Sequence, residues 1–381
     1  MSDLVALLST LVGFPSLCGT PNGEIIDWIE AQLLAAGARV QRIPGEVPDR
    51  FSLFAIIGPE APGGLILSAH ADVVPVAGQD WSSDPFILTR RGDRLYGRGS
   101  SDMKGFLACM LDAAQRVAAH PIPLSRPLYL AISHDEELGC LGVRSLLQAL
   151  SAGPDRAIQG CIVGEPTQMQ VALAHKGKTA FTIACHGVAA HSANPGQGLN
   201  AITLAGSMIH AVSALQEKIE ISERRDGRFA VPFSTVQVGL VSGGAALNIV
   251  PDHCVLSAEM RLLPGYEPGP YLNWLREAGA RAVADLGGGR VEIEVTNAYP
   301  GLDMEPGGAL CATVLREAGR NHTTTIDFGT EAGLFREILS LDCVVCGPGS
   351  IDRAHKADEY ITEAELEEGA RFVDALVARL R

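Results

Sequence analysis

The sequence lacks the features of a protein that binds nucleic acid or crosses a membrane. Acidic residues outnumber basic ones by 44 to 30, for a formal net charge of -14, whereas nucleic-acid binding needs clustered Lys and Arg. No stretch approaches the roughly 18 uninterrupted apolar residues of a membrane span, and no basic amphipathic helix indicates a membrane surface. We therefore expect no nucleic-acid partner and no membrane partner.

A disulfide framework and a secretory signal are also missing. The nine cysteines are an odd number, and several lie in apolar segments such as 106–110 and 160–163, as buried free thiols of a reducing compartment do. Cys343 and Cys346 form one isolated CxxC pair, for which we favour a structural role over metal binding. The N-terminus has no basic region ahead of its helically spaced apolar residues. We therefore expect a cytoplasmic protein.

The pattern of apolar residues indicates two domains in a chain of 381 residues, which is long for one compact core. Short apolar runs alternate with helical patterns in the first part, as in an α/β domain with a largely buried sheet. The expected strands are 51–57, 65–69, 128–133 and 160–163, and the expected helices are 4–12, 23–36, 105–119 and 142–152. The second of these helices should end at Gly37, a suitable C-terminal cap.

The pattern changes at residue 178. From there the strands alternate more cleanly between apolar and polar residues, with helices between them at 200–220 and 271–286, which indicates a smaller α+β domain. The first pattern returns after residue 295. We predict an α/β fold with a discontinuous domain, 1–177 and 296–381, in which helices sandwich a mixed sheet, and an inserted α+β domain at 178–295.

Five short segments place possible metal ligands beside glycines or at the ends of apolar runs. They are LILSAHADVVP with His70 and Asp72, GRGSSDMKG with Asp102, AISHDEELG with Glu136 and Glu137, CIVGEPT with Glu165, and CGPGSIDRAHKADEY with His355. In an open α/β sheet, sites collect beyond the carboxyl ends of the strands. One such residue alone is more often structural, and the adjacent glutamates could form a solvated acidic corner. The complete set is what favours a metal site.

The residue types of this set suit a pair of divalent cations. Two histidines and several carboxylates, without cysteine, are ligands for zinc, cobalt or manganese. A carboxylate that bridges two such ions holds them about 3.5–4 Å apart, so that they acidify one shared water. A separate glutamate must take the proton of that water and pass it to the leaving amine. An adjacent pair serves this purpose, because one carboxylate can bind metal while its neighbour stays free.

These motifs resemble those of the zinc aminoacylase and deacylase family, which includes acetylornithine deacetylase, succinyl-diaminopimelate desuccinylase and carboxypeptidase G. HADVVP, GRGSSDMKG, EELG, GEPT and HKADE occur in the family's order over essentially the whole chain. The resemblance implies two zinc ions per subunit, with cobalt or manganese as possible substitutes. It implies Asp102 as the bridging carboxylate, His70 and Glu165 as the ligands of one metal, and Glu137 and His355 as the ligands of the other.

The resemblance also implies roles outside the ligand set. Glu136 matches the general acid/base, and Asp72 matches a carboxylate that orients a ligating histidine. The domain at 178–295 is implied to be a lid and dimerisation domain of a homodimer. There, His191 corresponds to a histidine that reaches the active site of the other subunit and polarises the scissile carbonyl, with a hydrogen-bonded surface histidine as the alternative. Asn248 and Arg261 match positions near the substrate.

The loop DFGTEAGLF bears on the identity of the small-molecule substrate. It resembles the corresponding loop of acetylornithine deacetylases and carries Thr330 and Glu331 as candidate substrate contacts. A spare carboxylate at Glu331 would suit the cationic side chain of ornithine, but the residue equally suits the first turn of a helix. The expected reaction is hydrolysis of the N-acyl amino acid N2-acetyl-L-ornithine to L-ornithine and acetate, a step of arginine biosynthesis.

Other functions stay open on this scaffold. They include succinyl-diaminopimelate desuccinylase, another N-acyl-amino-acid deacylase, and a dipeptidase or carboxypeptidase. From a different class, the chain could be an inactive metal-binding or regulatory protein. The intact seven-residue set argues against that, because a binding protein has no need for an unligated glutamate beside a metal ligand.

Overall fold

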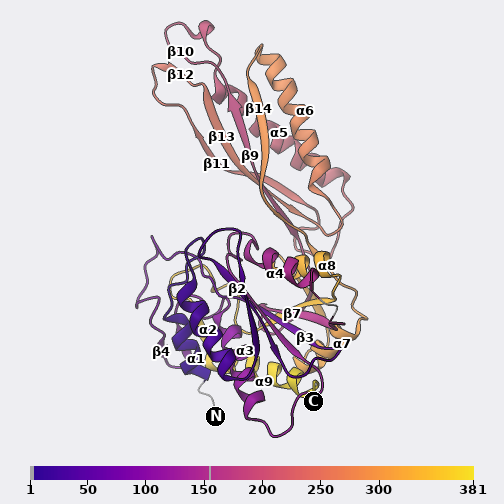
Figure 1. The fold of residues 1–381 in the computed structure, drawn as a ribbon. Coiled ribbons are helices and arrows are strands. Elements are labelled where there is room, and N and C mark those ends of the chain that lie inside the picture. The colour runs from indigo at the N-terminus through magenta and orange to yellow at the C-terminus, as the bar shows by residue number, and fades with distance from the viewer. Residues whose placement is uncertain (1–3, 154–155) are drawn as a thin grey trace. The chain divides into compact units, whose positions relative to one another are not determined.

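The computed structural model describes residues 4–153 and 156–381, and the chain divides into two compact units. Unit 1 comprises Met1–Ala174, Leu302–Ile326 and Thr330–Arg381, and unit 2 comprises His175–Gly301 and Asp327–Gly329. The boundaries inferred from the sequence, 178 and 295, lie inside strands β9 and β14 of unit 2. Each unit is described by itself below (Figure 1).

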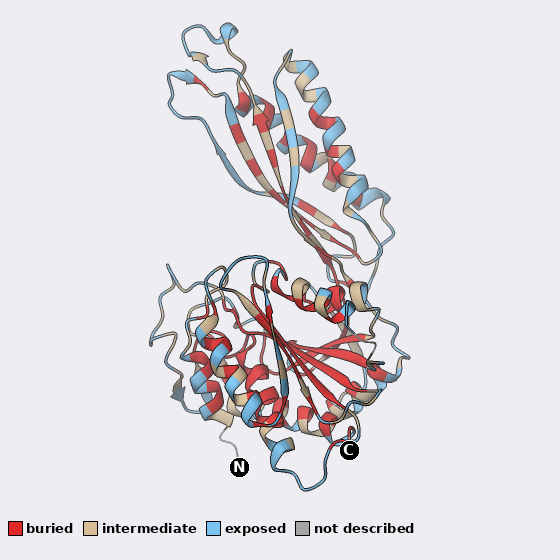
Figure 2. Cartoon of the chain, viewed as in Figure 1, coloured by how far each residue is buried: buried red, intermediate tan, exposed pale blue. Residues whose placement is uncertain are grey.

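The described part of unit 1 contains a nine-stranded mixed sheet, as the sequence predicts. Its order is β1-β2-β6-β3-β7-β17-β8-β15, and β16 pairs with β8. The central strands β6, β3, β7 and β17 run parallel to one another. Their residues are all buried (red in Figure 2), as in a sheet covered on both faces. The strands are β1 Arg39–Pro44, β2 Phe51–Ile57, β3 Leu65–His70, β6 Leu128–Ser133, β7 Gly160–Pro166, β8 Val171–His175, β15 Leu302–Asp303, β16 Thr323–Ile326 and β17 Cys343–Gly347.

Helices cover this sheet because each has an apolar stripe to bury. Helices α1, α2, α3, α7 and α9 share one core cluster with alternate residues of β2, β3 and β6, whereas α4 and α8 contact each other and the sheet. Gly37, with φ +75°, follows α2 as the expected left-handed cap. The helices are α1 Leu4–Val12, α2 Gly23–Ala35, α3 Lys104–Ala119, α4 Gly142–Ser151, α7 Ala309–Glu317, α8 Ala332–Leu339 and α9 Glu363–Ala378. A small sheet of order β18-β5-β4 (Tyr360–Thr362, Arg94–Tyr96, Thr89–Arg91) completes the described unit.

Unit 2 is an antiparallel sheet with two long helices. Over its described residues the strand order is β11-β13-β9-β14, and α5 and α6 pack on the sheet through one apolar cluster. Burial alternates residue by residue along β9 and β13, which matches the clean alternation of the sequence. The elements are β9 Gly177–His186, β10 Ala190–His191, α5 Ala201–Ser222, β11 Thr235–Gly243, β12 Ile249–Val250, β13 His253–Leu262, α6 Pro268–Leu286 and β14 Arg290–Tyr299, with a 3-10 turn η1 at Pro195–Gln197.

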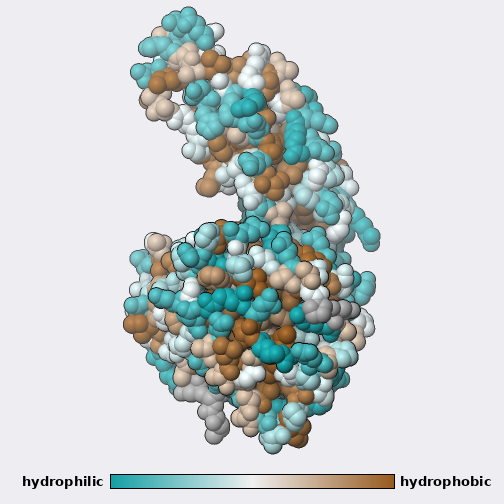
Figure 3. Space-filling view, viewed as in Figure 1, coloured by the Kyte–Doolittle hydropathy of each residue, from teal (hydrophilic) through white to brown (hydrophobic). Residues whose placement is uncertain are grey.

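On the face of each unit that Figure 3 shows, hydrophilic and hydrophobic side chains are mixed. In unit 2 some large apolar side chains are strongly exposed, among them Leu240 (70%), Ile221 (86%) and Leu247 (103%). Among the described residues, none of the helices combines the length and the apolar character needed to cross a bilayer.

Candidate active site

The carboxyl ends of three parallel strands bring the first group of predicted ligands together. His70 is the last residue of β3, Glu165 lies near the end of β7, and Glu137 follows β6 after a short turn. Because His70 pairs in register with Ser133, the ends of β3 and β6 are level. Asp102 lies just before α3, whose packing against β3 places it at the same edge of the sheet.

The carboxylate of Asp102 lies between two histidines. Its Oδ1 is 3.2 Å from Nε2 of His70, and its Oδ2 is 3.3 Å from Nε2 of His355. Nε2 of His355 also lies 3.0 Å from Oε2 of Glu137, and Nε2 of His70 lies 3.9 Å from Oε1 of Glu165. Each oxygen of Asp102 therefore faces a different histidine, and each histidine has a second carboxylate beside it.

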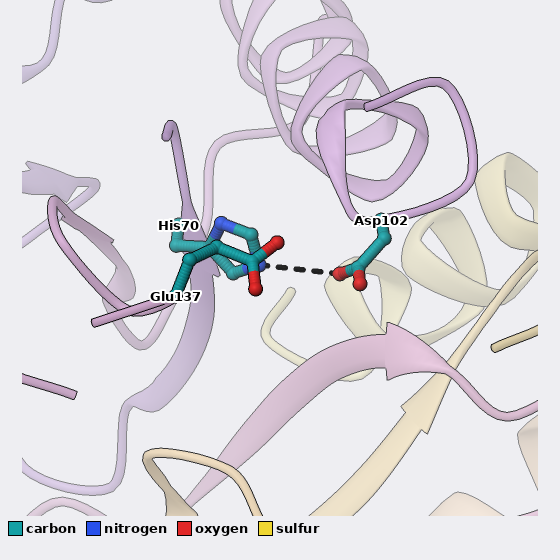
Figure 4. A group of neighbouring side chains, drawn as sticks. All are labelled: His70, Asp102 and Glu137. Carbon is teal, nitrogen blue, oxygen red and sulfur yellow. Dashed lines mark hydrogen bonds and ion pairs between the residues drawn. The ribbon is translucent and has the colours of Figure 1, made fainter. Parts of the chain in front are cut away.

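Two overlapping groups of potential ligand atoms result from this arrangement. Those of His70, Asp102 and Glu137 lie within 4.8 Å of one another, and so do those of His70, Glu136 and Glu165. Figure 4 shows the first group, in which the carboxylates of Asp102 and Glu137 and the ring of His70 point into one common space. The structure thus brings together all five residues predicted as ligands, together with the predicted base.

The site concentrates negative charge in a buried place. Burial, together with repulsion from Asp102, raises the pKa of Glu165 well above its usual value. Burial and the charge of Glu137 raise the pKa of Glu136 to about 8, against the attraction of His70. Burial also raises the pKa of Glu137. Cationic groups are thus too few to neutralise these carboxylates, and the shortfall is what bound divalent cations would supply.

The two histidines change the pKa of the Asp102 carboxylate in the opposite direction. Although burial raises the pKa of Asp102, hydrogen bonds from His355 and His70 bring it well below its usual value. The same contacts with Asp102 and Glu137 raise the pKa of His355 to about 10. Imidazole nitrogens and carboxylate oxygens at these separations are a donor set that zinc, cobalt or manganese accepts. The residues present therefore fit a pair of divalent cations.

Asp72 connects His70 to the turn that carries Glu136 and Glu137. Its Oδ1 and Oδ2 accept the backbone N–H groups of Glu136 and Glu137, each at 3.2 Å. Its Oδ1 is also 3.6 Å from Nδ1 of His70, and its own backbone carbonyl lies closer to that nitrogen, at 2.9 Å. The Asp72 segment therefore sets the ring orientation of His70 through its backbone and anchors the 136–137 turn through its carboxylate.

Three residues near this turn were not expected from the sequence. Asp135, at φ +51°, forms an ion pair of 2.6 Å with Arg50 and accepts the backbone N–H of Gly19 at 2.7 Å. The thiol of Cys140 donates to Oε1 of Glu136 at 3.2 Å. The HDEE motif displays Asp135, but nothing local identifies Arg50, which lies 85 residues earlier.

The side chain of Glu331 is enclosed in the protein. It is 1% exposed, and its Oε2 accepts the hydroxyl of Ser68 at 3.2 Å. Ser68 stands two residues before His70, so both point to the same face of β3. Burial raises the pKa of Glu331 to about 7. The neighbouring Thr330 is also buried, and its hydroxyl accepts the backbone N–H of Ala332 at 3.1 Å.

The remaining predicted residues belong to unit 2. His191 is exposed on β10, and its Nδ1 accepts the backbone N–H of Ala193 at 3.1 Å. Asn248 is exposed just before β12. Arg261 donates from Nε to Glu259 at 2.6 Å and from Nη1 to the hydroxyl of Tyr299 at 3.3 Å. The roles of these three residues toward a substrate stay predictions.

Comparisons with known proteins place this geometry in context. The sequence model described as "Peptidase family M20/M25/M40" matches residues 66–379. A tripeptidase from Staphylococcus aureus has a similar structure, at 21% identity and a TM-score of 0.78, over 99% of this chain and 97% of that chain. An M20 family metallo-carboxypeptidase from Sulfolobus solfataricus is similar at 17% identity and 0.80, over 99% of each chain. A dinuclear metal-binding M20 peptidase from Bacillus subtilis matches at 16% and 0.71, over 99% and 97%.

Proposed function

The chain belongs to peptidase family M20/M25/M40, and on that premise we propose that it is a two-zinc hydrolase that removes the acyl group of an N-acyl amino acid. The observation that carries the proposal is the Asp102 carboxylate, whose two oxygens lie 3.2 and 3.3 Å from the Nε2 atoms of His70 and His355. A carboxylate whose two oxygens face different histidines could serve both metals of a two-metal site.

Five residues would hold the pair. Asp102 would bridge, His70 and Glu165 would complete one position, and Glu137 and His355 would complete the other. The chemistry that a bound zinc pair supplies is the acidification of a water and the polarisation of an acyl carbonyl. Cobalt and manganese suit the same ligands, because none of the five is a thiolate.

The protein itself moves the proton. Glu136 has its carboxylate beside the ligand atoms of His70 and Glu165, and its backbone N–H is fixed by Asp72. Glu136 takes a proton from the attacking water and hands it to the nitrogen that leaves as the acyl C–N bond breaks. The thiol of Cys140, which donates to Oε1 of Glu136, orients this carboxylate.

We also propose that the active form is a cytoplasmic homodimer joined through unit 2, in which His191 polarises the carbonyl of the substrate bound by the other protomer. Strand β11 lies at the edge of its sheet and exposes Leu240 and Val241 (70% and 58%). An apolar edge strand favours association with another chain. All nine cysteines lie among the described residues and are free, which supports a reducing compartment. A fully active monomer in sedimentation at micromolar concentration would contradict the dimer.

N2-Acetyl-L-ornithine is the preferred substrate in this proposal, with arginine biosynthesis as its setting. The support is the resemblance of the DFGTEAGLF loop to that of acetylornithine deacetylases. Within this loop, Glu331 is the candidate partner for the ornithine amine. Its carboxylate accepts the hydroxyl of Ser68, which lies on the same face of β3 as His70, and it is buried to the same degree as His70.

An exopeptidase is the second candidate, because the family to which the chain belongs is a peptidase family. The tripeptidase and the metallo-carboxypeptidase share the fold over nearly the whole chain. Their identity of 21% or less shows the fold alone, so their substrates serve here only as test compounds.

A substrate panel on zinc-loaded protein tests the proposal. The panel contains N2-acetyl-L-ornithine, N-acetyl amino acids with neutral side chains, N-succinyl-diaminopimelate, dipeptides and a tripeptide, each assayed for release of a primary amine. Glu136→Gln protein purified in parallel controls for contaminating hydrolases. We expect the highest kcat/KM for N2-acetyl-L-ornithine. Faster turnover of the peptides would replace the deacetylase by the exopeptidase, and no turnover of any compound by protein with two bound metals would refute the hydrolase.

A further inference from the structure

A buried ion pair lies beside the metal-ligand residues without belonging to them. Nη1 of Arg98 donates to Oε2 of Glu359 at 2.7 Å, and both side chains are 1% exposed. The two residues flank ligands in the sequence, because Arg98 precedes Asp102 in GRGSSDMKG and Glu359 follows His355 in HKADEY. The pair therefore links the two segments that carry Asp102 and His355.

The carboxylate of Glu359 organises the backbone that presents Asp102. Its Oε2 accepts the N–H of Gly99 at 3.0 Å, and its Oε1 accepts the N–H groups of Ser101 and Asp102 at 2.9 and 3.1 Å. Hydrogen bonds to an ionised acceptor are short and strong. Together with Arg98, these donors account for both oxygens of Glu359, so the carboxylate acts as a template for the loop that ends at Asp102.

The other end of the network holds the backbone of His355. This residue has φ +62°, a left-handed conformation that is uncommon for a residue with a side chain. Nε2 of Gln79 donates to the carbonyl of His355 at 2.9 Å. Oε1 of Gln79 in turn accepts from Nη2 of Arg98 at 2.5 Å and from the indole N–H of Trp81 at 3.1 Å. Gln79 is thereby oriented with its amide N–H toward His355.

From these contacts we propose that Gln79, Arg98 and Glu359 are positioning residues that set the Asp102 carboxylate and the His355 imidazole for metal binding. The inference rests on the proposed two-metal function. Arg98 is the centre of the network, since its Nη1 meets Glu359 and its Nη2 meets Gln79. Gln79 reaches the ligands through the carbonyl of His355, so its loss should act on the metal position that Glu137 and His355 would complete, whereas Arg98 and Glu359 also support the bridging Asp102.

Gln79 is the residue whose replacement can test the positioning role without endangering the fold. Arg98 and Glu359 are fully buried, so replacing either one endangers the fold. Gln79 is half-buried in a loop and its amide serves the network. Gln79→Ala removes both functions of the amide. Gln79→Glu keeps acceptor oxygens for Arg98 and Trp81 but has no N–H to donate to the carbonyl of His355.

The test is a titration of the metal-free full-length protein with Co²⁺. Calorimetry and the visible absorption of the bound cobalt measure the binding. The wild type should take up two equivalents. In Gln79→Ala and Gln79→Glu one equivalent should bind about 10- to 100-fold more weakly, as loss of a partner behind a metal ligand commonly produces. The other equivalent and the thermal midpoint of the metal-free protein should not change. Gln148→Ala, an exposed glutamine on α4, is the matched control and should bind cobalt as the wild type does.

The outcomes separate this inference from the function on which it rests. If both Gln79 variants bind two equivalents of cobalt with wild-type affinity, the positioning role is overturned and the metal site itself is not. An equal loss of both equivalents together with a lower thermal midpoint would show a merely structural role and also overturn it. A wild type that takes up no metal would overturn the proposed function, and the network with it. As a further check, saturating cobalt should restore kcat in Gln79→Glu with KM unchanged.

Discussion

Replacing Glu136 by glutamine tests whether two adjacent glutamates divide proton transfer and metal binding between them. Both backbone N–H groups are held by the carboxylate of Asp72, so the two side chains leave the same turn from fixed positions. The Glu137 carboxylate points at His355, 3.0 Å away, whereas Oε1 of Glu136 accepts the thiol of Cys140. Glutamine at position 136 keeps the shape and an acceptor oxygen but cannot carry a proton.

The expected fall in kcat follows from the role of the Glu136 carboxylate in proton transfer. A positioned general acid or base contributes about 10²- to 10⁴-fold to the rate. At about 1.4 kcal/mol for each factor of ten, that is roughly 3–5 kcal/mol of the barrier. Glu136 would serve twice in one turnover, first as base and then as acid, so we expect kcat to fall toward the upper end of this range. The two metals and KM should be retained.

Glu137→Gln is the matched variant and should behave in the opposite way. It removes the charge of the carboxylate that we propose as a ligand of one metal, so the protein should lose one equivalent of metal and recover activity when metal is added in excess. The assay is the initial rate of amine release from the best substrate of the panel, with metal content measured on the same samples by mass spectrometry. The reasoning fails if Glu136→Gln keeps two metals and loses less than about tenfold in kcat, which is only about 1.4 kcal/mol, or if it loses a metal with its activity.

Three further predictions concern metal removal, packing and pH. Chelation should abolish activity, zinc or cobalt should restore it, and the metal-free protein should show a lower thermal midpoint, because a ligand that binds only the folded state stabilises it; full activity at zero metal content would contradict this. Gly164→Ala should destabilise unit 1 by about 1–3 kcal/mol, because a Cβ there would lie 1.9 Å from the ring of Phe106. Gly196→Ala, with nothing within 4 Å, is its control in the same thermal melts, and equal midpoints would refute the packing argument. Burial lowers the pKa of His175 from 6.5 to about 4, so the unfolded chain takes up the proton first as pH falls. The contribution of neutral His175 to the free energy of unfolding is therefore fully present above about pH 6.5 and is lost toward pH 4, by as much as roughly 3 kcal/mol. The free energy of unfolding in urea, measured across this pH range, should fall less steeply in His175→Gln than in the wild type.

The elements of unit 1 could be predicted from the sequence because their signals are local. The expected strands 51–57, 65–69 and 128–133 are β2, β3 and β6 to within one residue, and the expected helices 4–12 and 105–119 are α1 and α3 to the same tolerance. Short apolar runs indicate buried strands, and apolar residues that recur with a period of 3.6 residues indicate helices. Neither signal reports which strands become neighbours, so the order in which β6, β3, β7 and β17 lie side by side required the structure.

Local sequence patterns also do not predict hydrogen bonds between polar residues that lie far apart in the chain. From the sequence, Glu331 suits either a substrate contact or the first turn of a helix, and no local pattern indicates its hydrogen bond with Ser68, 263 residues away. The sequence suggests no role for Glu359 in the HKADEY motif. In the structure its carboxylate accepts hydrogen bonds from three backbone N–H groups of the Asp102 loop and from the guanidinium of Arg98. Such pairs form only when loops from distant segments meet.

The chemistry available to this protein could be predicted from residue types alone. Two histidines and a set of carboxylates, each beside a glycine or at the end of an apolar run, identify a site for two divalent cations and a hydrolytic reaction. The positions of these side chains follow from the fold, which brings Asp102 between His70 and His355 and turns Glu137 toward His355. The physical reason is that residue type is local, whereas the distance between side chains depends on how parallel strands and distant loops align at one edge of the sheet.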